Sequence, residues 1–373
     1  MRIYQVGGSV RDELLGLAVQ DRDWVVVGAD PREMERLGFR PVGADFPVFL
    51  HPQTHEEYAL ARTERKTGPG YKGFAFHAAP DVTLEQDLAR RDLTINAMAR
   101  AEDGALIDPH GGAADLKARV LRHVSAAFAE DPVRILRVAR FAARLGFAVA
   151  PETLALMRRM VEAGEADALV PERVWQEIGR GLMEAAPSRM LAVLAECGAL
   201  ARILPELDRA LGRPGAAGSL AARLDRAAAR ALGLPVRFAL LVLDLDAAHA
   251  AALAARVNAP GDCRDLAAIA IRERELARVE TGGDAQSTLA LLERVDAFRR
   301  PERLERLVEV AECDAAAGPG RAFASRADLV PALAAARAVD GGELAREFPD
   351  DIPGAVRRAR LAAIAALQPP TGH

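Results

Sequence analysis

The chain has 373 residues, of which half are hydrophobic and 27% are charged. This composition supplies enough apolar residues for a sizeable core and excludes wholesale disorder, and the length predicts two to four domains. The net charge of −4 gives no basic signal over the whole chain, so a nucleic-acid partner has to be argued from local sites.

The three cysteines are widely spaced and form no CxxC pair. That pattern excludes a disulfide framework and a cysteine metal site, and it is typical of a reduced intracellular protein. The N-terminal residues show no signal-peptide core, and no apolar run approaches the roughly 18 residues of a membrane span. We therefore expect a cytoplasmic protein without membrane contact.

The N-terminal third mixes strand-like and helix-like segments. Runs rich in valine, tyrosine and phenylalanine predict short strands at residues 2–6, 23–27, 47–50 and 56–61. The helix-like segments "SVRDELLG" and "PREMERLG" lie between them, and each ends at a glycine. This part is predicted to be a domain of mixed α and β structure.

From residue 126 onward the sequence predicts helices. Alanine, leucine, arginine and glutamate dominate, and apolar residues recur at three- and four-residue spacing. The stretches "LGRPGAAGS" (211–219) and "DAAAGPGRAFASRAD" (314–328) predict loops or domain junctions. No internal repeat of fixed period is present.

The stretch "QVGGSVRD" places Gly7 and Gly8 between a predicted strand and a helix that Ser9 could cap. Glycines at such a turn let the backbone approach an anion, and N–H groups at a helix start favour phosphate. Arg11 adds a charged fork. An ordinary strand-to-helix turn explains the glycines alone, because neither the P-loop nor the dinucleotide fingerprint is present.

The stretch "DRDWVVVG" puts two carboxylates, Asp21 and Asp23, beside an apolar run. Side chains alternate along a strand, so both are expected on one face. Two adjacent carboxylates repel unless a cation lies between them, and hard oxygen ligands suit Mg²⁺. Such a pair supports metal-assisted phosphoryl transfer. The alternative is a solvated strand end.

Two polar stretches follow. "ARTERKTGPGYKGF" (61–74) has four basic residues, three glycines and a proline, which predicts a mobile basic loop over a phosphate-handling site or, alternatively, a plain surface hairpin. "LARRDLTINAMA" (88–99) predicts a helical apolar face of Leu88, Ile95 and Ala99, with "RRD" elsewhere. An arginine there could bind a triphosphate, and a carboxylate or Asn96 could contact a ribose hydroxyl.

The stretch "EDPVRILRVARFAARLGF" predicts a helix that Asp131 caps. Four arginines recur at three- or four-residue intervals and form one basic stripe, made of Arg134, Arg137, Arg140 and Arg144. A solvated amphipathic helix normally explains such a stripe, but glutamate and lysine are missing from this one.

These motifs together resemble a known family. "GGSVRD", "DRDWVVVG", "RRDLTINAMA", "IDPHGGAADL", "EDPVRILRVARFAARLGF" and "PERVWQEI" occur in the order seen in class II CCA-adding tRNA nucleotidyltransferases, close relatives of bacterial poly(A) polymerases. The resemblance implies an α+β fold with a polymerase-β-like nucleotidyltransferase head at residues 1–125. All-α parts would follow: a neck at 126–212, a body at 213–285 and a tRNA-binding tail at 286–373.

The same resemblance implies the site. Asp21 and Asp23 would hold catalytic Mg²⁺, and eight residues would bind the nucleotide: Gly8, Arg11, Arg91, Asp92, Asp131, Arg134, Arg137 and Arg140. Among these, Asp92 would contact the ribose and Asp131 with Arg134 would read the base. The loop at 62–73 would switch the enzyme from adding C to adding A.

Elementary chemistry agrees with this assignment. Cytosine and adenine both present an exocyclic amino donor beside a ring-nitrogen acceptor, which a carboxylate and an arginine can read without a template. Uracil and guanine reverse the pattern and leave buried polar groups unpaired, at a cost of about 1–3 kcal/mol per group. The implied reaction is attack of the tRNA 3′-hydroxyl on the α-phosphate of CTP or ATP, with release of pyrophosphate. Glu57 is a candidate third carboxylate.

The C-terminal half departs from the family pattern. Relatives often carry a metal-binding HD phosphohydrolase domain, but here Leu243 stands where a histidine should precede Asp244, and Asp246-Ala247 replaces Gly-Lys. After residue 123 the only histidines are His249 and His373, too few for an imidazole-rich site. We expect a degenerate HD domain without phosphohydrolase activity.

Alternatives remain open at this point. They are a poly(A) polymerase, an enzyme that adds only A or only CC, an HD-type hydrolase, and an inactive RNA-binding homologue. The missing histidines count against the hydrolase, and retention of both aspartates counts against the inactive homologue. The partners expected are the 3′ end and acceptor region of tRNA, CTP and ATP, with "RRAR" (357–360) a candidate RNA-backbone contact. The sequence sets no oligomeric state.

Overall fold

The computed structural model describes residues 1–19, 21–42, 48–66, 74–77, 79–279, 284–318 and 325–367. The chain divides into two compact units. Unit 1 comprises Met1–Gly181 and Arg189–Ile203, and unit 2 comprises Leu182–Ser188 and Leu204–His373. Among the described residues, no helix combines the length and the apolar character that crossing a membrane requires.

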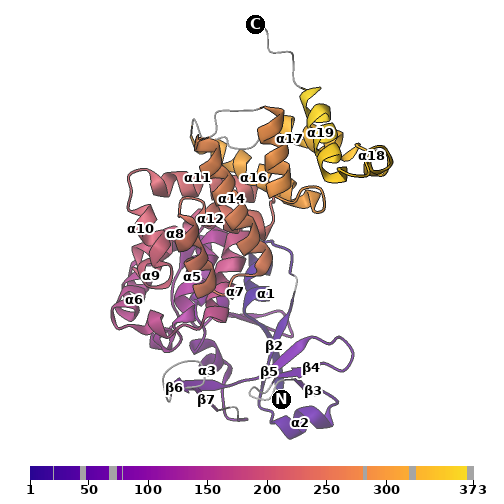
Figure 1. Cartoon of the computed structure of the whole chain (residues 1–373). Coiled ribbons are helices and arrows are strands. Elements are labelled where there is room, and N and C mark those ends of the chain that lie inside the picture. The colour runs from indigo at the N-terminus through magenta and orange to yellow at the C-terminus, as the bar shows by residue number, and fades with distance from the viewer. Residues whose placement is uncertain are drawn as a thin grey trace. The chain divides into compact units, whose positions relative to one another are not determined.

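Unit 1 contains a mixed seven-stranded sheet with the strand order β3-β4-β5-β2-β1-β8-β9. Within this sheet, β2 and β5 pair in parallel, and all other neighbouring strands pair antiparallel. In chain order the strands are β1 (Arg2–Val6), β2 (Asp23–Val27), β3 (Arg40–Val42), β4 (Val48–Leu50), β5 (Glu57–Leu60), β8 (Ala99–Ala101) and β9 (Leu106–Ile107). The four strands predicted from sequence are confirmed; Figure 1 shows their indigo and purple ribbons.

The central strand β2 is covered on both faces because its side chains alternate. Val25 and Val27 pack into one cluster with Tyr4, Val6 and residues of the helix at 84–89. Val26 belongs to a second cluster on the other face, against which the half-buried Trp24 packs. Since both neighbours of β2 are also paired strands, the residue that begins it, Asp23, stands on a rigid support.

The remaining elements of unit 1 are mostly helices that follow the sheet strands. Two small additional pairings are β6 (Thr63–Lys66) with β7 (Phe74–His77) and β10 (Val120–Leu121) with β11 (Ala148–Val149). The helices are α1 (Gly8–Leu14), α2 (Pro31–Arg36), α3 (Leu84–Ala89), α4 (Gly112–Ala118), α5 (Val133–Leu145), α6 (Pro151–Glu162), α7 (Pro171–Met183), α8 (Pro187–Glu196) and α9 (Ala199–Ile203), with 3-10 turns η1 (Thr94–Asn96), η2 (Ala126–Glu130) and η3 (Glu165–Ala168).

Three local expectations were wrong. Gly7, at φ 74°, takes the N-cap position of α1, and the Ser9 hydroxyl instead donates to the Val6 carbonyl from inside the helix. Residues 88–99 do not form one helix: α3 ends at Ala89, and η1 and β8 follow. Between them the Asp92 side chain accepts from the Leu93 backbone N–H, a local bond that competes with helix formation, and from the side-chain amide of Asn96. Asp21 precedes β2 and is not part of the strand.

Described separately, unit 2 is helical, which confirms the prediction for the C-terminal half. Its helices are α10 (Pro205–Leu211), α11 (Ala216–Ala229), α12 (Leu234–Val242), α13 (Ala247–Arg256), α14 (Gly261–Val279), α15 (Ala285–Arg294), α16 (Pro301–Ala315), α17 (Arg326–Arg337), α18 (Gly341–Glu347) and α19 (Ile352–Ala365) (Figure 1). The predicted junction at 211–219 shrinks to the four residues between α10 and α11. Part of the second predicted junction, 319–324, lies outside the described residues.

The arginines of "RRAR" all contact side chains within unit 2. Arg357 lies 3.5 Å from a Glu293 carboxylate oxygen, and Arg358 donates to Asp351 at 3.0 Å. The Arg360 guanidinium stands 3.9 Å from the centre of the Phe298 ring. An RNA-backbone role for this stretch stays a prediction, and these contacts would compete with it.

A buried ring of charges joins four helices of unit 2. Arg223 of α11, the bulkiest fully buried side chain in the described part of the chain, donates to Asp314 of α16 at 3.0 Å and to Asp244, which follows α12. Arg274 of α14 completes the ring, with 2.8 Å to Asp244 and 3.0 Å to Asp314. Burial alone would raise the pKa of Asp244, but the hydrogen bonds and charges of the two arginines outweigh burial and lower it.

This ring predicts a large stability effect for a single substitution. Arg223→Met keeps the length of the side chain but leaves Asp314 buried with one partner fewer, so we expect the free energy of unfolding to fall by about 3–5 kcal/mol. The double variant Arg223→Met, Asp314→Leu should recover part of the loss, because the remaining Arg274–Asp244 pair is neutral. Urea denaturation followed by circular dichroism gives the free energy of unfolding of the wild type, the single variant and the double variant. Arg358→Ala, which removes an exposed ion pair, is the control, and an equal effect of control and Arg223→Met would contradict the prediction.

Candidate active site

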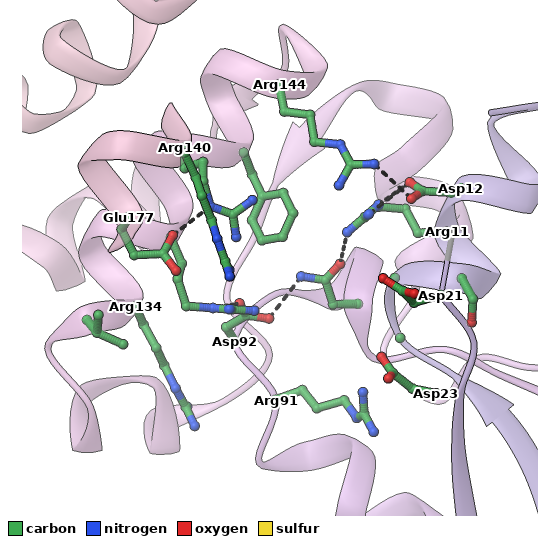
Figure 2. A pocket seen from close by; sticks show the side chains of 18 of the residues that line it. Arg11, Asp12, Asp21, Asp23, Arg91, Asp92, Arg134, Arg140, Arg144 and Glu177 are labelled. Atoms are coloured by element: carbon green, nitrogen blue, oxygen red, sulfur yellow. Dashed lines mark hydrogen bonds and ion pairs between the residues drawn. The ribbon is translucent and has the colours of Figure 1, made fainter. Parts of the chain in front are cut away.

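Unit 1 contains a polar pocket with a volume of about 730 Å³, within the range of small-molecule sites. Among the described residues, nine arginines and six carboxylates line it, an excess of three positive charges. The side chains come from α1, the residues around the start of β2, the segment between α3 and η1, and helices α5 and α7. Figure 2 shows Asp21 and Asp23 on one side of the pocket and Arg140 with Glu177 on the other.

All ten site residues proposed from the sequence line this one pocket: Gly8, Arg11, Asp21, Asp23, Arg91, Asp92, Asp131, Arg134, Arg137 and Arg140. Arg144, the fourth member of the basic stripe, lines it as well. The stripe therefore faces a cavity, and two of its members, Arg134 and Arg140, are buried.

Asp21 and Asp23 are both exposed and both line the pocket. Asp23 is in register with Val6, directly before the Gly7-Gly8 turn. Partial desolvation by the surrounding protein raises the pKa of Asp23, the charge of Asp21 adds to this, and the charge of Arg91 opposes it. A carboxylate pair with mutual repulsion fits a hard divalent cation that completes its shell with water and substrate oxygens.

The candidate third carboxylate is close in the sheet but outside the pocket. Glu57 lies directly across from Asp23 in the parallel β2–β5 pair, which places both residues on the same face. It does not line the pocket, and no group of three or more candidate metal ligands is found among the described residues. A role for Glu57 as a third carboxylate stays a prediction.

One hydrogen-bonded chain connects the α1 side of the pocket to α5. Arg144 donates to Asp12 at 2.9 Å, and Asp12 accepts from Arg11 at 2.9 Å. Arg11 then donates to the side-chain oxygen of Asn96, whose amide nitrogen donates to Asp92 at 3.0 Å. Arg137 ends the chain with a 2.7 Å bond to Asp92. Asn96 is the only uncharged member, and it links an arginine to an aspartate by using both ends of its amide.

Neighbouring groups shift the pKa values of the charged residues in this hydrogen-bonded chain. Burial alone would raise the pKa of Asp92, but the charge of Arg137 and the bonds from Asn96 and Leu93 lower it. Conversely, Asp92 raises the pKa of Arg137. Burial lowers the pKa of Arg11, although Asp12 opposes the effect. Asp92 is therefore ionised under any ordinary condition and acts only as a hydrogen-bond acceptor.

The Phe141 ring lies among three arginines of the pocket. The guanidinium carbons of Arg140, Arg11 and Arg137 lie 4.6, 5.0 and 5.7 Å from its centre. The electron-rich faces of an aromatic ring attract cations, and the effect grows when both are desolvated. Phe141 thus offsets part of the repulsion among neighbouring arginines.

Arg91 lies against the glycine turn. A side chain at Gly7 would place its Cβ 2.8 Å from the Arg91 Nη1, and the positive φ of Gly7 independently disfavours other residues. Asp87, fully buried, holds both Arg90 and Arg91, and their charges outweigh burial and lower the pKa of Asp87. The loop geometry and the arginine position therefore depend on one another.

The residues proposed to read the base have well-defined partners. Asp131 accepts two bonds from Arg173 of α7, at 3.0 and 2.7 Å, and one from the Val133 backbone N–H at 3.1 Å. Arg134 donates to the carbonyl oxygens of Ala127 at 2.9 Å and Arg90 at 2.7 Å. Asp131 lies just before α5, and Arg134 lies in the first turn of this helix. The two residues therefore do not share one face of a helix.

Helix α7 contributes residues that the sequence analysis did not assign. Arg173, Gln176, Glu177 and Arg180 line the pocket, and Glu177 accepts a 2.6 Å bond from Arg140. Their three- and four-residue spacing puts them on one helix face, which is a signal the sequence offered. Asp12 and Phe141 were missed because each resembles an ordinary helix residue.

The region expected to resemble an HD site lies in unit 2, next to a separate pocket of about 610 Å³. Leu243 is buried, and both oxygens of Asp244 accept bonds from arginine. Asp246 caps α13 and lies 2.6 Å from the His249 ring nitrogen. This set of side chains does not suit a transition metal, because guanidinium groups already occupy the carboxylate.

Comparison with known proteins relates this architecture to RNA-processing enzymes. Residues 3–122 match the family described as the poly A polymerase head domain, and residues 146–211 match one described as a probable RNA and SrmB-binding site of polymerase A. A multifunctional CCA protein of Azoarcus sp. is 56% identical over 402 residues, covering 99% of this chain and 98% of that protein. One of Burkholderia lata is 55% identical over 407 residues, covering 98% of each.

A solved structure agrees in fold over nearly the whole chain. The CCA-adding enzyme of Bacillus stearothermophilus in complex with CTP has a TM-score of 0.69 and 26% sequence identity, covering 98% of this chain and 88% of that one. Together with the curated relatives, it shows that this chain belongs to the family of CCA-adding tRNA nucleotidyltransferases, whose catalytic head is shared with poly(A) polymerases.

Proposed function

We propose that this protein adds the sequence CCA to the 3′ end of tRNA from CTP and ATP, without a template and with release of pyrophosphate. The observation that carries the proposal is an arginine-rich pocket that is lined both by the exposed carboxylate pair Asp21 and Asp23 and by Asp131 with Arg134. Figure 2 shows the carboxylate pair and Arg134 on different sides of this pocket. Two relatives described above, 56% and 55% identical to this chain, are named multifunctional CCA proteins, which supports the proposal. We place the reaction in the cytoplasm.

Nucleotidyltransferases of this family depend on a divalent metal, and we propose Mg²⁺ held by Asp21 and Asp23. The bound ion would lower the pKa of the attacking hydroxyl and neutralise charge on the triphosphate. The rigid strand β2 keeps Asp23 in place, and the pKa of Asp23 is raised because its charge is poorly solvated without a cation. Both features favour a carboxylate that gains from binding a cation.

The remaining residues would orient the nucleotide. Arg11, Arg91, Arg137 and Arg140 supply guanidinium groups for the triphosphate, and Gly8 lets the backbone come close. Asp92 already accepts three bonds, which leaves one acceptor position for a ribose hydroxyl. Asp131 would accept from the amino group of cytosine or adenine, and Arg134 would donate to the ring nitrogen.

The finer assignments of the chain are also proposals. We propose a head at 1–125, a neck at 126–212, a body at 213–285 and a tRNA-binding tail at 286–373, with a switch role for the loop at 62–73. Residues 67–73 of that loop lie outside the described residues. We further propose that the body lacks phosphohydrolase activity, which the arginine partners of Asp244 support.

The first prediction concerns the carboxylate pair. Asp21→Asn and Asp23→Asn should each reduce incorporation of labelled CTP and ATP into tRNA lacking CCA by about 10³-fold or more, since metal stabilisation of the reaction amounts to several kcal/mol. Glu102→Gln changes an exposed carboxylate that does not line the pocket, so it is the control and should retain activity. Wild-type protein that incorporates neither nucleotide with Mg²⁺ present would refute the proposed function.

The same assay distinguishes a poly(A) polymerase, which the head-domain match also permits. With ATP alone and a tRNA ending in CC, we expect addition to stop after one A. With a generic RNA we expect no extended tail. A long A tail on either RNA would favour the polymerase instead.

The second prediction concerns pH. The ionised form of Asp23 would bind the cation, and its pKa is raised, so activity should be lost on the acidic side at a higher pH than an ordinary carboxylate would give. The charge of Arg91 lowers the pKa of Asp23, so Arg91→Gln should move this acidic limb to still higher pH. A profile of kcat/KM against pH measures both. Added Mg²⁺ should move the limb to lower pH, because metal and proton compete.

The third prediction concerns Asn96. Asn96→Leu removes both bonds that link Arg11 to Asp92, so we expect kcat/KM to fall by about 10–100-fold for CTP and ATP alike. The preference for these nucleotides over UTP and GTP should be unchanged, because Asn96 does not contact Asp131 or Arg134. Single-nucleotide addition rates for all four triphosphates provide the measurement, and a selective loss for one base would contradict the role.

A further inference from the structure

Arg173 holds the carboxylate of Asp131 in one orientation. Its two terminal nitrogens donate to the two different oxygens of Asp131, at 3.0 Å to Oδ1 and 2.7 Å to Oδ2. This fork-to-fork geometry fixes the plane of the carboxylate, which a single bond from a lysine would not do. Both side chains are largely buried, with 26% and 19% exposure, so solvent screens the pair only in part.

The bonds on Asp131 leave one acceptor position. A carboxylate offers about four acceptor positions. Oδ1 uses two of them, for Arg173 and for the Val133 backbone N–H, and Oδ2 uses one for Arg173. The position that remains therefore belongs to Oδ2, and Asp131 lines the pocket.

Arg134 is not the residue that orients Asp131. Its terminal nitrogens donate to the carbonyl oxygens of Ala127 and Arg90, so the backbone places it independently of the Asp131 side chain. The only side chain that donates to Asp131 among the described residues is Arg173, which comes from a different helix, 42 positions later in the chain.

Resting on the proposed function, we propose that Arg173 is a positioning residue that sets base selection by holding Asp131 so that one carboxylate acceptor position is left for the base. The amino group of cytosine or adenine supplies a proton to that position. Uracil and guanine present a carbonyl oxygen at the equivalent place, which has no proton and is repelled by a carboxylate that cannot turn away. Without Arg173 the carboxylate rotates, and the repulsion is relieved.

The experiment measures addition of each of the four nucleotides, supplied singly with Mg²⁺, to tRNA lacking CCA and to tRNA ending in CC. For Arg173→Ala we expect kcat/KM for CTP and ATP to fall by about 10–100-fold, as for loss of charged hydrogen bonds. The values for UTP and GTP should fall less or rise, so that discrimination drops by at least about tenfold. Arg173→Lys should give an intermediate loss of discrimination, because lysine keeps the positive charge but cannot donate two parallel hydrogen bonds to the carboxylate.

Two further variants separate positioning from a structural role. Arg202→Ala removes an exposed ion pair with Asp167 in the same unit, outside the pocket, and should leave discrimination unchanged. In the Asp131→Ala background, Arg173→Ala should cause no further loss of discrimination, because it acts through Asp131. Equal losses for all four nucleotides, or a full additional loss in the Asp131→Ala background, would overturn the inference.

The outcomes also distinguish this inference from the function on which it rests. If wild-type protein adds CTP and ATP but the Arg173 variants keep the wild-type ratio, the inference alone fails. If wild-type protein adds neither, the proposed function fails first.

Discussion

The pocket depends on one constraint, which is that many arginines can lie close together only if their charges are balanced. Buried Asp12, Asp92 and Glu177 each accept from one or two of them. The Phe141 ring contacts three guanidinium groups at once. The balance is incomplete, since three positive charges remain over the described lining residues, and this excess suits a triphosphate.

The bonds among these arginines and acids also fix the positions of the helices that carry them. A continuous chain of bonds runs from Arg144 through Asp12, Arg11, Asn96 and Asp92 to Arg137, so that α1 and α5 constrain one another. Asn96 is central to it because an amide donates and accepts at the same time. Elsewhere in the pocket lining, the bidentate contact between Arg173 and Asp131 orients the proposed base-reading carboxylate. Preorganised groups of this kind need no rearrangement when a substrate binds.

Unit 2 uses arginine differently. There Arg223 and Arg274 form a closed, electrically neutral ring with the buried Asp314 and the half-buried Asp244, at a point where four helices meet. Such a ring specifies how the helices pack, because removing one member leaves an uncompensated buried charge. The two arginines provide positive charge at the carboxylate where the family resemblance would have placed a metal site.

The sequence by itself determined the mixed α and β character of the head and the helical C-terminal half, because strand alternation and helix periodicity are local properties. Its ordered motifs, through their resemblance to a known family, named ten residues that line one pocket. The sequence did not determine the break at residues 88–99, where the Asp92 side chain accepts from the Leu93 backbone N–H and from the Asn96 side-chain amide. Only the tertiary structure decided which acid balances which arginine, since Arg144 meets Asp12 across 132 positions and Arg173 meets Asp131 across 42. Those pairings depend on how separate elements pack, and packing is a property of the folded chain that no single segment carries.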